Sequence, residues 1–262
     1  MGDYAIEVTP ASAVGASKYL RMLMLGTAGV GKTSCVLLTA PKPIYVINSD
    51  RKTSLNPATE LCLESKVKLD WGSSLVHSAD KMEAAIKTAK QLVKEKNYKT
   101  VVWDTMSSYS KFLLEQCVQA SLTAAGKPDG RKFWPEYHKR LEAVVDRLHL
   151  LEAHVIVCSH WEDNSSSEDD SDEKKTPKVG EGIVPMLGGA SRKRAGQWFE
   201  DVVFLQKMKD DSRVLKTNIE GVWGPSSKSI PGVSEMPADI TNFIKVKEER
   251  LKRLIRNAGG AR

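Results

Sequence analysis

Short unbroken apolar runs recur along the chain and are separated by longer mixed segments. Such runs are typical of strands that are buried on both faces of a parallel sheet. They predict strands at residues 20–25, 44–48, 100–103, 155–158 and 202–205. Two weaker runs, at residues 67–69 and 213–217, predict further short strands, and the second could form a hairpin with 202–205.

Amphipathic segments between the strands predict helices at residues 32–39, 79–96 and 108–123. In the second helix, Ser78 is a suitable N-cap. Its apolar side chains recur at the spacing of one helix face: Met82, Ile86, Ala89 and Val93. Each of these predicted helices lies between two predicted strands, and in the second helix apolar residues recur every three or four positions instead of following one another.

Two further helices are expected in the second half of the chain. Pro135 suits the first turn of a helix, and one apolar face follows it, formed by Tyr137, Leu141, Val144, Leu148 and Leu151. Residues 240–256 predict a basic helix or tail. Residues 125–131, which are rich in turn formers, are expected to be a loop.

The alternation of strands and helices predicts an α/β fold with a mostly parallel central sheet and helices on both faces. Ligands of such sheets bind at the carboxyl ends of the strands. Asp50, Asp104 and His160 each follow an apolar strand. If those strands are neighbours of the first strand, the three side chains converge on one site.

Residues 26–33 have the pattern G-x-x-x-x-G-K-T between a predicted strand and a predicted helix. Glycines let backbone N–H groups surround phosphates, and the following helix presents its N-terminus to the same anion. Lys32 can reach the β- and γ-phosphates, and the Thr33 hydroxyl can ligate Mg²⁺. The pattern predicts ATP and Mg²⁺ as cofactors, bound by Gly26, Thr27, Ala28, Gly29, Val30, Gly31, Lys32, Thr33 and Ser34.

The polar residues at the strand ends are candidates for catalysis together with Lys32. Asp104 fits a carboxylate that holds the Mg²⁺ shell with Thr33. Asp50 could orient or deprotonate the attacking water, which needs a carboxylate near the γ-phosphate. His160 could donate a hydrogen bond to the γ-phosphate. The alternative is that each is an ordinary turn or capping residue.

Charge and cysteine content add information about partners and setting. The 262-residue chain has a net charge of +6, and residues 162–175 carry a local charge of −5, so the remaining chain carries about +11. The positive charge of the chain outside residues 162–175 favours a polyanionic partner. The alternative is that these basic residues only form a solvated surface. The four cysteines have no C-x-x-C spacing, which favours reduced thiols and a cytoplasmic protein. No stretch reaches the about 20 apolar residues that span a membrane.

These features divide the chain into an N-terminal arm at residues 1–18, a core at 19–245 and a basic tail at 246–262. Residues 162–182 are expected to form a mobile acidic loop. The segments that follow Asp104 and His160 are expected to be mobile, and aromatic and basic residues in or near them could bind single-stranded nucleic acid by stacking and phosphate contact. They are Tyr109, Phe133, Trp134, Trp161, Lys111, Arg131, Lys132, Arg192, Lys193 and Arg194. The alternative for Phe133 and Trp134 is a role as core anchors of their helix.

With these motifs in place, the chain resembles the RecA-core ATPases of phages, of the short single-strand-annealing and recombination type. The resemblance covers residues 18–245 and includes the segments 26–33, 44–50, 101–105, 155–160 and 199–205. It implies a RecA-like P-loop NTPase fold and a DNA-stimulated ATPase that binds single-stranded DNA and promotes annealing or strand exchange. It also implies a homo-oligomer in the host cytoplasm, with a single-stranded-DNA-binding protein as a possible partner.

In that family the carboxylate after the second strand is the catalytic base, and the resemblance implies this role for Asp50. The polar residue after the later strand senses the γ-phosphate, and the resemblance implies this role for His160. RecA has Glu where this chain has Asp50, and the acidic insertion after His160 departs from its DNA-binding loop. Of the Lys-x-Arg pair near the end, only Lys228 matches. Lys228 or Arg213 could reach the phosphates of a neighbouring subunit, or could be solvent-exposed charges.

Three other functions remain open from the sequence. A small GTPase needs an Asn-Lys-x-Asp or Thr-Lys-x-Asp motif, which is not present. A small-molecule kinase usually has an Arg-rich lid, and residues 191–194 are a poor candidate. A non-enzymatic ATP-binding scaffold or loader for replication proteins would retain its function when Asp50 and His160 are changed.

Overall fold

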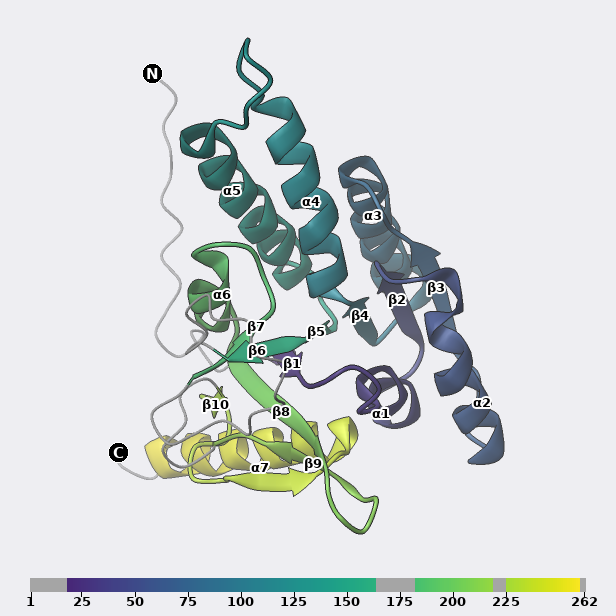
Figure 1. Ribbon diagram of the computed structural model, residues 1–262. Helices are drawn as coiled ribbons and strands as arrows, with labels where there is room; N and C mark the ends of the chain where they lie inside the picture. The colour runs from purple at the N-terminus through teal and green to yellow at the C-terminus, as the bar shows by residue number, and fades with distance from the viewer. Residues whose placement is uncertain (1–17, 164–181, 219–224, 260–262) are drawn as a thin grey trace, which may run out of the picture.

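The computed structural model describes residues 18–163, 182–218 and 225–259. One large sheet contains most of the strands (Figure 1): β1 Arg21–Leu25, β2 Ile44–Asn48, β3 Trp71–Leu75, β4 Thr100–Asp104, β5 His154–Ser159, β8 Asp201–Lys207, β9 Arg213–Lys216, β10 Ser226–Ser227 and β11 Glu235–Pro237. Two further strands, β6 Trp161–Asp163 and β7 Ile183–Pro185, pair with each other in a separate antiparallel sheet.

The strand order is β11-β9-β8-β1-β5-β4-β2-β3, and β10 pairs with β8. All pairings from β8 to β3 are parallel. The pairings of β9 with β8, β11 with β9 and β10 with β8 are antiparallel. The fold is therefore the expected α/β type with a mostly parallel central sheet, and the expected β8–β9 hairpin is confirmed.

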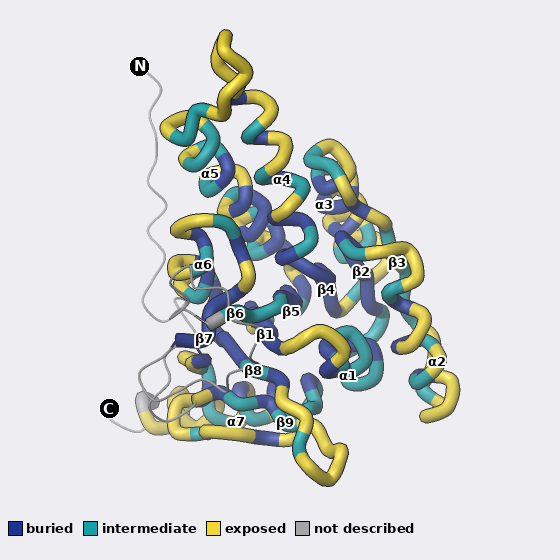
Figure 2. The backbone as a smooth tube through the Cα atoms, viewed as in Figure 1, coloured by how far each residue is buried: buried dark blue, intermediate teal, exposed yellow. Residues whose placement is uncertain are grey.

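Helices cover both faces of the sheet (Figure 1). The helices are α1 Lys32–Thr39, α2 Asn56–Glu64, α3 Ala79–Lys96, α4 Met106–Ala120, α5 Gly130–His149, α6 Ser191–Arg194 and α7 Ile240–Gly259, with 3₁₀ turns η1 Lys52–Leu55 and η2 Ala195–Trp198. One face carries α3, α4 and α5, and the other carries α1, α2 and α7. The central strands β1, β2, β4 and β5 are buried almost throughout (Figure 2).

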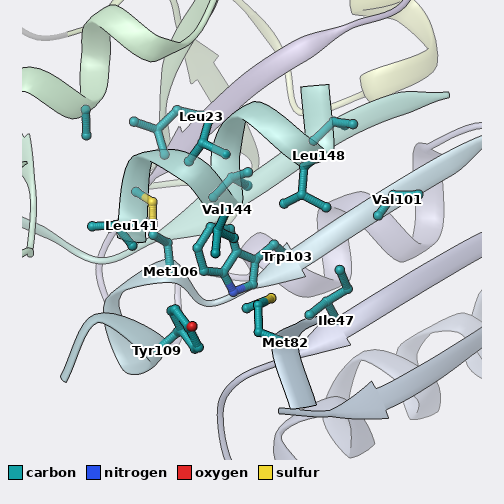
Figure 3. Packing of buried hydrophobic residues seen from close by; sticks show 14 of the residues in the cluster. Leu23, Ile47, Met82, Val101, Trp103, Met106, Tyr109, Leu141, Val144 and Leu148 are labelled. Carbon is teal, nitrogen blue, oxygen red and sulfur yellow. The ribbon is translucent and has the colours of Figure 1, made fainter. Parts of the chain in front are cut away.

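Alternation along each strand supplies one core to each face. In β1, Leu23 and Leu25 belong to the core under α3, α4 and α5, whereas Met22 and Met24 belong to the core under α1 and α7. Trp103 is fully buried in the first core (Figure 3), where it packs among residues of α3, α4 and α5. The two cores fix the sheet from both sides and so hold the strands that carry the strand-end residues.

Several elements have the bounds that the sequence predicts, and others do not. The helices at residues 32–39 and 79–96 are confirmed, and the Ser78 side chain accepts a hydrogen bond from Lys81 N. The strand predicted at residues 67–69 is wrong: the edge strand β3 lies at Trp71–Leu75. Its centre is Gly-Ser-Ser, so it has no apolar run to reveal it.

Helix boundaries in the middle of the chain also differ. α4 begins at Met106 and ends at Ala120, rather than covering 108–123, because Thr105 caps it by accepting from Ser108 N. α5 begins at Gly130, where the Asp129 carboxylate caps it, so Pro135 lies inside the helix and not in its first turn. The loop predicted at residues 125–131 therefore ends at Asp129.

The last described element is helix α7, which continues to Gly259 through most of the expected basic tail. Residues 1–17 of the expected arm at 1–18 lie outside the described residues, as do residues 164–181 of the expected acidic loop. The domain boundaries stay predictions. Among the described residues, no helix is long and apolar enough to cross a membrane.

Candidate nucleotide-binding site

The loop between β1 and α1 has the shape that a phosphate-binding loop requires. Gly29 and Gly31 have φ values of 75° and 99°, a region that side chains disfavour. Lys32 is buried, and its Nζ donates to the carbonyls of Gly26 and Thr27, each at 2.9 Å. Burial lowers the pKa of Lys32, and the nearby Asp104 and Asp50 oppose this effect. The ammonium group is thus held at the mouth of the loop.

Thr33 and Asp104 form a pair of oxygen donors at the start of α1. The Thr33 hydroxyl donates to Asp104 Oδ2 at 2.6 Å, although the two residues are 71 positions apart. Burial raises the pKa of Asp104, while the hydrogen bond from Thr33 and the charge of Lys32 lower it. A hydroxyl and a carboxylate are hard oxygen ligands of the type that Mg²⁺ takes.

Asp50 lies just beyond the end of β2, where Asn48 shapes the turn. The Asn48 side-chain oxygen accepts from Asp50 N at 2.9 Å and from the Ser54 hydroxyl at 3.3 Å. One Asp50 oxygen, Oδ1, accepts from Arg51 N at 2.9 Å. The carboxylate is partly exposed, so it can contact water.

His160 follows β5, the strand that pairs with β1 on one side and β4 on the other. Its Nδ1 lies 3.4 Å from Lys32 Nζ. Its backbone N–H donates to the Ser107 hydroxyl at 2.9 Å, and that hydroxyl is 2.8 Å from Ser159 Oγ. Burial and the positive charge of Lys32 lower the pKa of His160, which favours the neutral ring.

The proposed catalytic residues surround one cavity of about 280 Å³. Lys32, Asp50, Asp104 and His160 all line it. The loop residues Ala28, Gly29, Gly31, Thr33 and Ser34 also contribute, whereas Gly26, Thr27 and Val30 of the predicted binding set are not part of its lining. The structure thus brings together side chains from four strand ends, although of β2, β4 and β5 only β5 is a direct neighbour of β1.

The opposite wall of this cavity was not foreseen from the sequence. It is formed by Ser54, Pro57 and Ala58 of η1 and α2. α2 buries only Ala58 and Cys62, so its apolar pattern is too sparse to predict a helix. The Pro57 ring at the start of a helix was the one available signal.

Arg213 and Lys228 lie in different places. Arg213 in β9 donates through Nε to Val30 O at 2.8 Å, so it contacts the phosphate loop of its own chain. Lys228 Nζ lies 3.4 Å from Phe199 O, and Lys228 lines a cavity with Glu200 and Arg250. The proximity of Arg213 to the loop could not be read from the sequence, because 183 positions separate the two bonded residues.

The aromatic residues considered for nucleic-acid stacking are largely engaged in packing. Tyr109 is 2% exposed and lies edge to face with Trp103. Trp134 stacks on His138, and Trp161 lies edge to face with Phe204. α4 starts directly after Thr105, so no loop follows β4. The expectation of a mobile segment after Asp104 is therefore wrong, and Phe133 and Trp134 pack against the core.

Among the described residues, no group of three or more His, Cys, Asp or Glu side chains could hold a metal ion. Mg²⁺ in nucleotide enzymes is usually bound by one or two protein ligands together with substrate phosphates. The Thr33 hydroxyl and the Asp104 carboxylate would supply these one or two protein ligands.

The family described as "AAA domain" matches residues 18–223. No curated protein matches the sequence. Solved structures with a similar fold include a prototypical ATPase from the type III secretion system of pathogenic bacteria, at 14% identity over 72% of this chain and 51% of that chain, with a TM-score of 0.43. Another is the ATP synthase subunit NeqB from Nanoarcheaum equitans, at 13% identity over 71% of this chain and 47% of that chain, with a TM-score of 0.42. The chain spans about half of the length of both.

Proposed function

The chain belongs to the AAA domain family, and on that premise we propose that it binds ATP with Mg²⁺ and hydrolyses it to ADP and phosphate. The observation that carries this proposal is the convergence of Lys32, Asp50, Asp104 and His160 on one cavity beside the phosphate loop. Phosphoryl transfer needs little beyond positioning and charge stabilisation, and these side chains provide both.

The phosphate loop binds the triphosphate through its backbone N–H groups and the N-terminus of α1. Lys32 exchanges its contacts with the Gly26 and Thr27 carbonyls for the β- and γ-phosphate oxygens. Thr33 and Asp104 hold the Mg²⁺ shell. The metal, when bound, neutralises charge that develops on the phosphate oxygens.

Asp50 accepts a proton from the attacking water, because its carboxylate faces the same cavity and is partly exposed. His160, neutral through its lowered pKa, donates a hydrogen bond to the γ-phosphate. Through Ser107 and Ser159, its backbone is joined to the start of α4. Loss of the γ-phosphate would therefore alter contacts at β5 and α4 together.

Replacement of Lys32 tests the proposal directly. In Lys32→Ala, the affinity for a fluorescent ATP analogue should fall by at least about tenfold, because a charge-assisted contact is worth about 1.5–3 kcal/mol. The matched control is Lys42→Ala, which removes a lysine that caps carbonyls at the end of the same helix. Equal affinity of wild type and Lys32→Ala would reject the site. A preference for GTP in competition would instead favour a GTPase.

We further propose that single-stranded DNA binds to the protein and stimulates ATP hydrolysis. The protein then promotes annealing or strand exchange, and its active form is a homo-oligomer. The positive charge of the chain supports this proposal, since residues outside 162–175 carry about +11. ATPase rates with and without single-stranded DNA test it, together with electron microscopy for rings or filaments. No stimulation, combined with no salt-sensitive binding, would reject it and leave the scaffold or loader function.

A further inference from the structure

A second groove borders the nucleotide cavity on the side away from the phosphate loop. Its volume is about 570 Å³, and it lies between the turn after β2, the end of β3 and the outer side of α4. Asp50 lines both this groove and the nucleotide cavity. The groove consists of described residues from three elements, and the functions proposed above do not use it.

The groove combines basic side chains with two aromatic rings, of which one is exposed and the other partly exposed. Arg51, Lys52 and Lys111 line it, and within residues 18–163, 182–218 and 225–259 their side chains have no ion-pair or hydrogen-bond partner. All three are exposed. The rings of His77 and Phe112 also line it and meet edge to face, with centroids 6.4 Å apart.

We propose that this groove binds unpaired nucleotides of a single-stranded nucleic acid. The inference rests on the proposed DNA-dependent ATPase and names the place of contact. Phosphates bind to Arg51, Lys52 and Lys111, and a base packs against the Phe112–His77 pair, because every base has a face that can stack on an aromatic ring. A duplex cannot use such rings, since its bases already stack on one another.

The two carboxylates of the lining are consistent with this ligand. Asp50 and Glu115 would repel phosphates but can accept hydrogen bonds from the amino groups of bases. The carboxylate side chains of an acidic protein segment would be repelled by Asp50 and Glu115 and cannot stack on the rings. This difference favours nucleotides over an acidic peptide as the occupant.

The position of the groove also couples it to hydrolysis. The Arg51 backbone N–H donates to Asp50 Oδ1 at 2.9 Å, and Asp50 is the proposed acceptor of the water proton. A strand that binds Arg51 therefore acts on the turn that orients this carboxylate. DNA bound here would change the turnover rate without touching the nucleotide.

The experiment measures binding of a fluorescein-labelled oligodeoxycytidylate, whose bases carry amino groups, to the full chain by fluorescence anisotropy at several salt concentrations. The groove variants are Lys52→Ala/Lys111→Ala and Phe112→Ala. The matched control is Lys87→Ala/Lys96→Ala, which removes two exposed lysines from α3. Unfolding temperatures of all variants show that they are folded, and ATP turnover of the wild type without DNA is measured in parallel.

We expect the double lysine variant to lose at least about tenfold in affinity and to lower the salt slope by about 1.4, since each phosphate contact contributes about 0.7 in single strands. Phe112→Ala should lose about fivefold or more without a change in slope, because base stacking is worth about 1–3 kcal/mol. The α3 control should bind as the wild type does.

Three results would overturn the inference. Unchanged binding by both groove variants would place the DNA elsewhere while leaving the DNA-dependent function intact. Wild-type protein that hydrolyses ATP but does not bind the oligonucleotide would reject the groove and the DNA partner, but not the ATPase. Displacement of the oligonucleotide by polyglutamate, with no effect of Phe112→Ala, would identify an acidic protein segment as the occupant.

Discussion

At the scale of single residues, the nucleotide site depends on short contacts between residues that lie far apart in the sequence. Thr33 bonds to Asp104, Lys32 lies beside His160, and Arg213 bonds to the carbonyl of Val30. Each contact joins the phosphate loop to a different strand. The loop is therefore held by its surroundings as well as by its own glycines.

Gly31 shows how little space this arrangement leaves. A Cβ atom at Gly31 would lie 2.9 Å from Arg213 Nε, and the residue has a φ of 99°. We predict that Gly31→Ala loses at least about tenfold in affinity for a fluorescent ATP analogue, because the loop must shift to relieve both strains.

Gly126→Ala is the matched control, since Gly126 also has a positive φ, of 71°, but nothing lies within 4 Å of the added atom. Both variants should lose stability of about 1–2 kcal/mol from the backbone conformation. If nucleotide affinity falls equally in both, or in neither, contact with Arg213 does not shape the loop.

At the scale of elements, the strands that carry the site were predictable and the walls around it were not. β1, β2, β4 and β5 each contain an unbroken apolar run because both of their faces are covered, and this produces a clear signal. β3 lies at the sheet edge with a Gly-Ser-Ser centre, and α2 buries only two side chains. Their positions follow from tertiary packing, which local patterns do not encode.

The short strand β10 illustrates an element held by a buried side chain. Asp201 is fully buried and accepts from Ser227 Oγ at 2.5 Å, Ser229 Oγ at 2.7 Å and Ser229 N at 3.2 Å. We predict that Asp201→Ala destabilises the fold by about 2–4 kcal/mol, because it leaves three donors without their acceptor.

Urea unfolding measures this effect. Asp210→Ala is the control, since Asp210 accepts similar bonds from Ser212 in an exposed turn and its loss should leave the unfolding midpoint unchanged. An Asp201→Ala variant as stable as the wild type would show that β10 does not depend on this carboxylate.

At the scale of the whole molecule, Arg21 forms a cluster with His149 and His154 at the amino ends of β1 and β5. Arg21 donates to the carbonyls of His149, Leu151 and Ala153, and so joins β1 to the end of α5. His154 Nδ1 accepts from Leu20 N at 3.1 Å. The mostly parallel sheet and its two-sided covering were predictable from the sequence pattern. The strand order and this cluster were not, because they depend on residues far apart in the sequence, about 130 positions in the cluster.

This cluster should make stability depend on pH. Burial, reinforced by the charge of Arg21, lowers the pKa of both His149 and His154 to about 4. The unfolded chain, with histidine pKa values near 6.5, binds protons that the folded chain excludes. The contribution of the two neutral histidines to the free energy of unfolding is therefore fully present above pH 6.5 and is lost as the pH drops towards 4.

Urea unfolding at pH 7.5, 5.5 and 4.5 measures this dependence. The double variant His149→Gln/His154→Gln should have a flatter profile than the wild type over this range, even if it is less stable at pH 7.5. Its matched control, His77→Gln, changes an exposed histidine and should keep the wild-type slope. Parallel profiles of the double variant and the wild type would contradict the assignment.

The central claim, that this cavity hydrolyses ATP with Asp50 as the acceptor of the water proton, is tested most directly by comparing Asp50→Asn with the wild type. The substitution keeps the size of the side chain and removes its basicity. Single-turnover hydrolysis of radiolabelled ATP with Mg²⁺ gives the rate, and a fluorescent ATP analogue gives the affinity. We predict nearly unchanged affinity and a rate lower by about 10²–10⁴. Hydrolysis by Asp50→Asn at the wild-type rate, or no hydrolysis by the wild type, would contradict the claim.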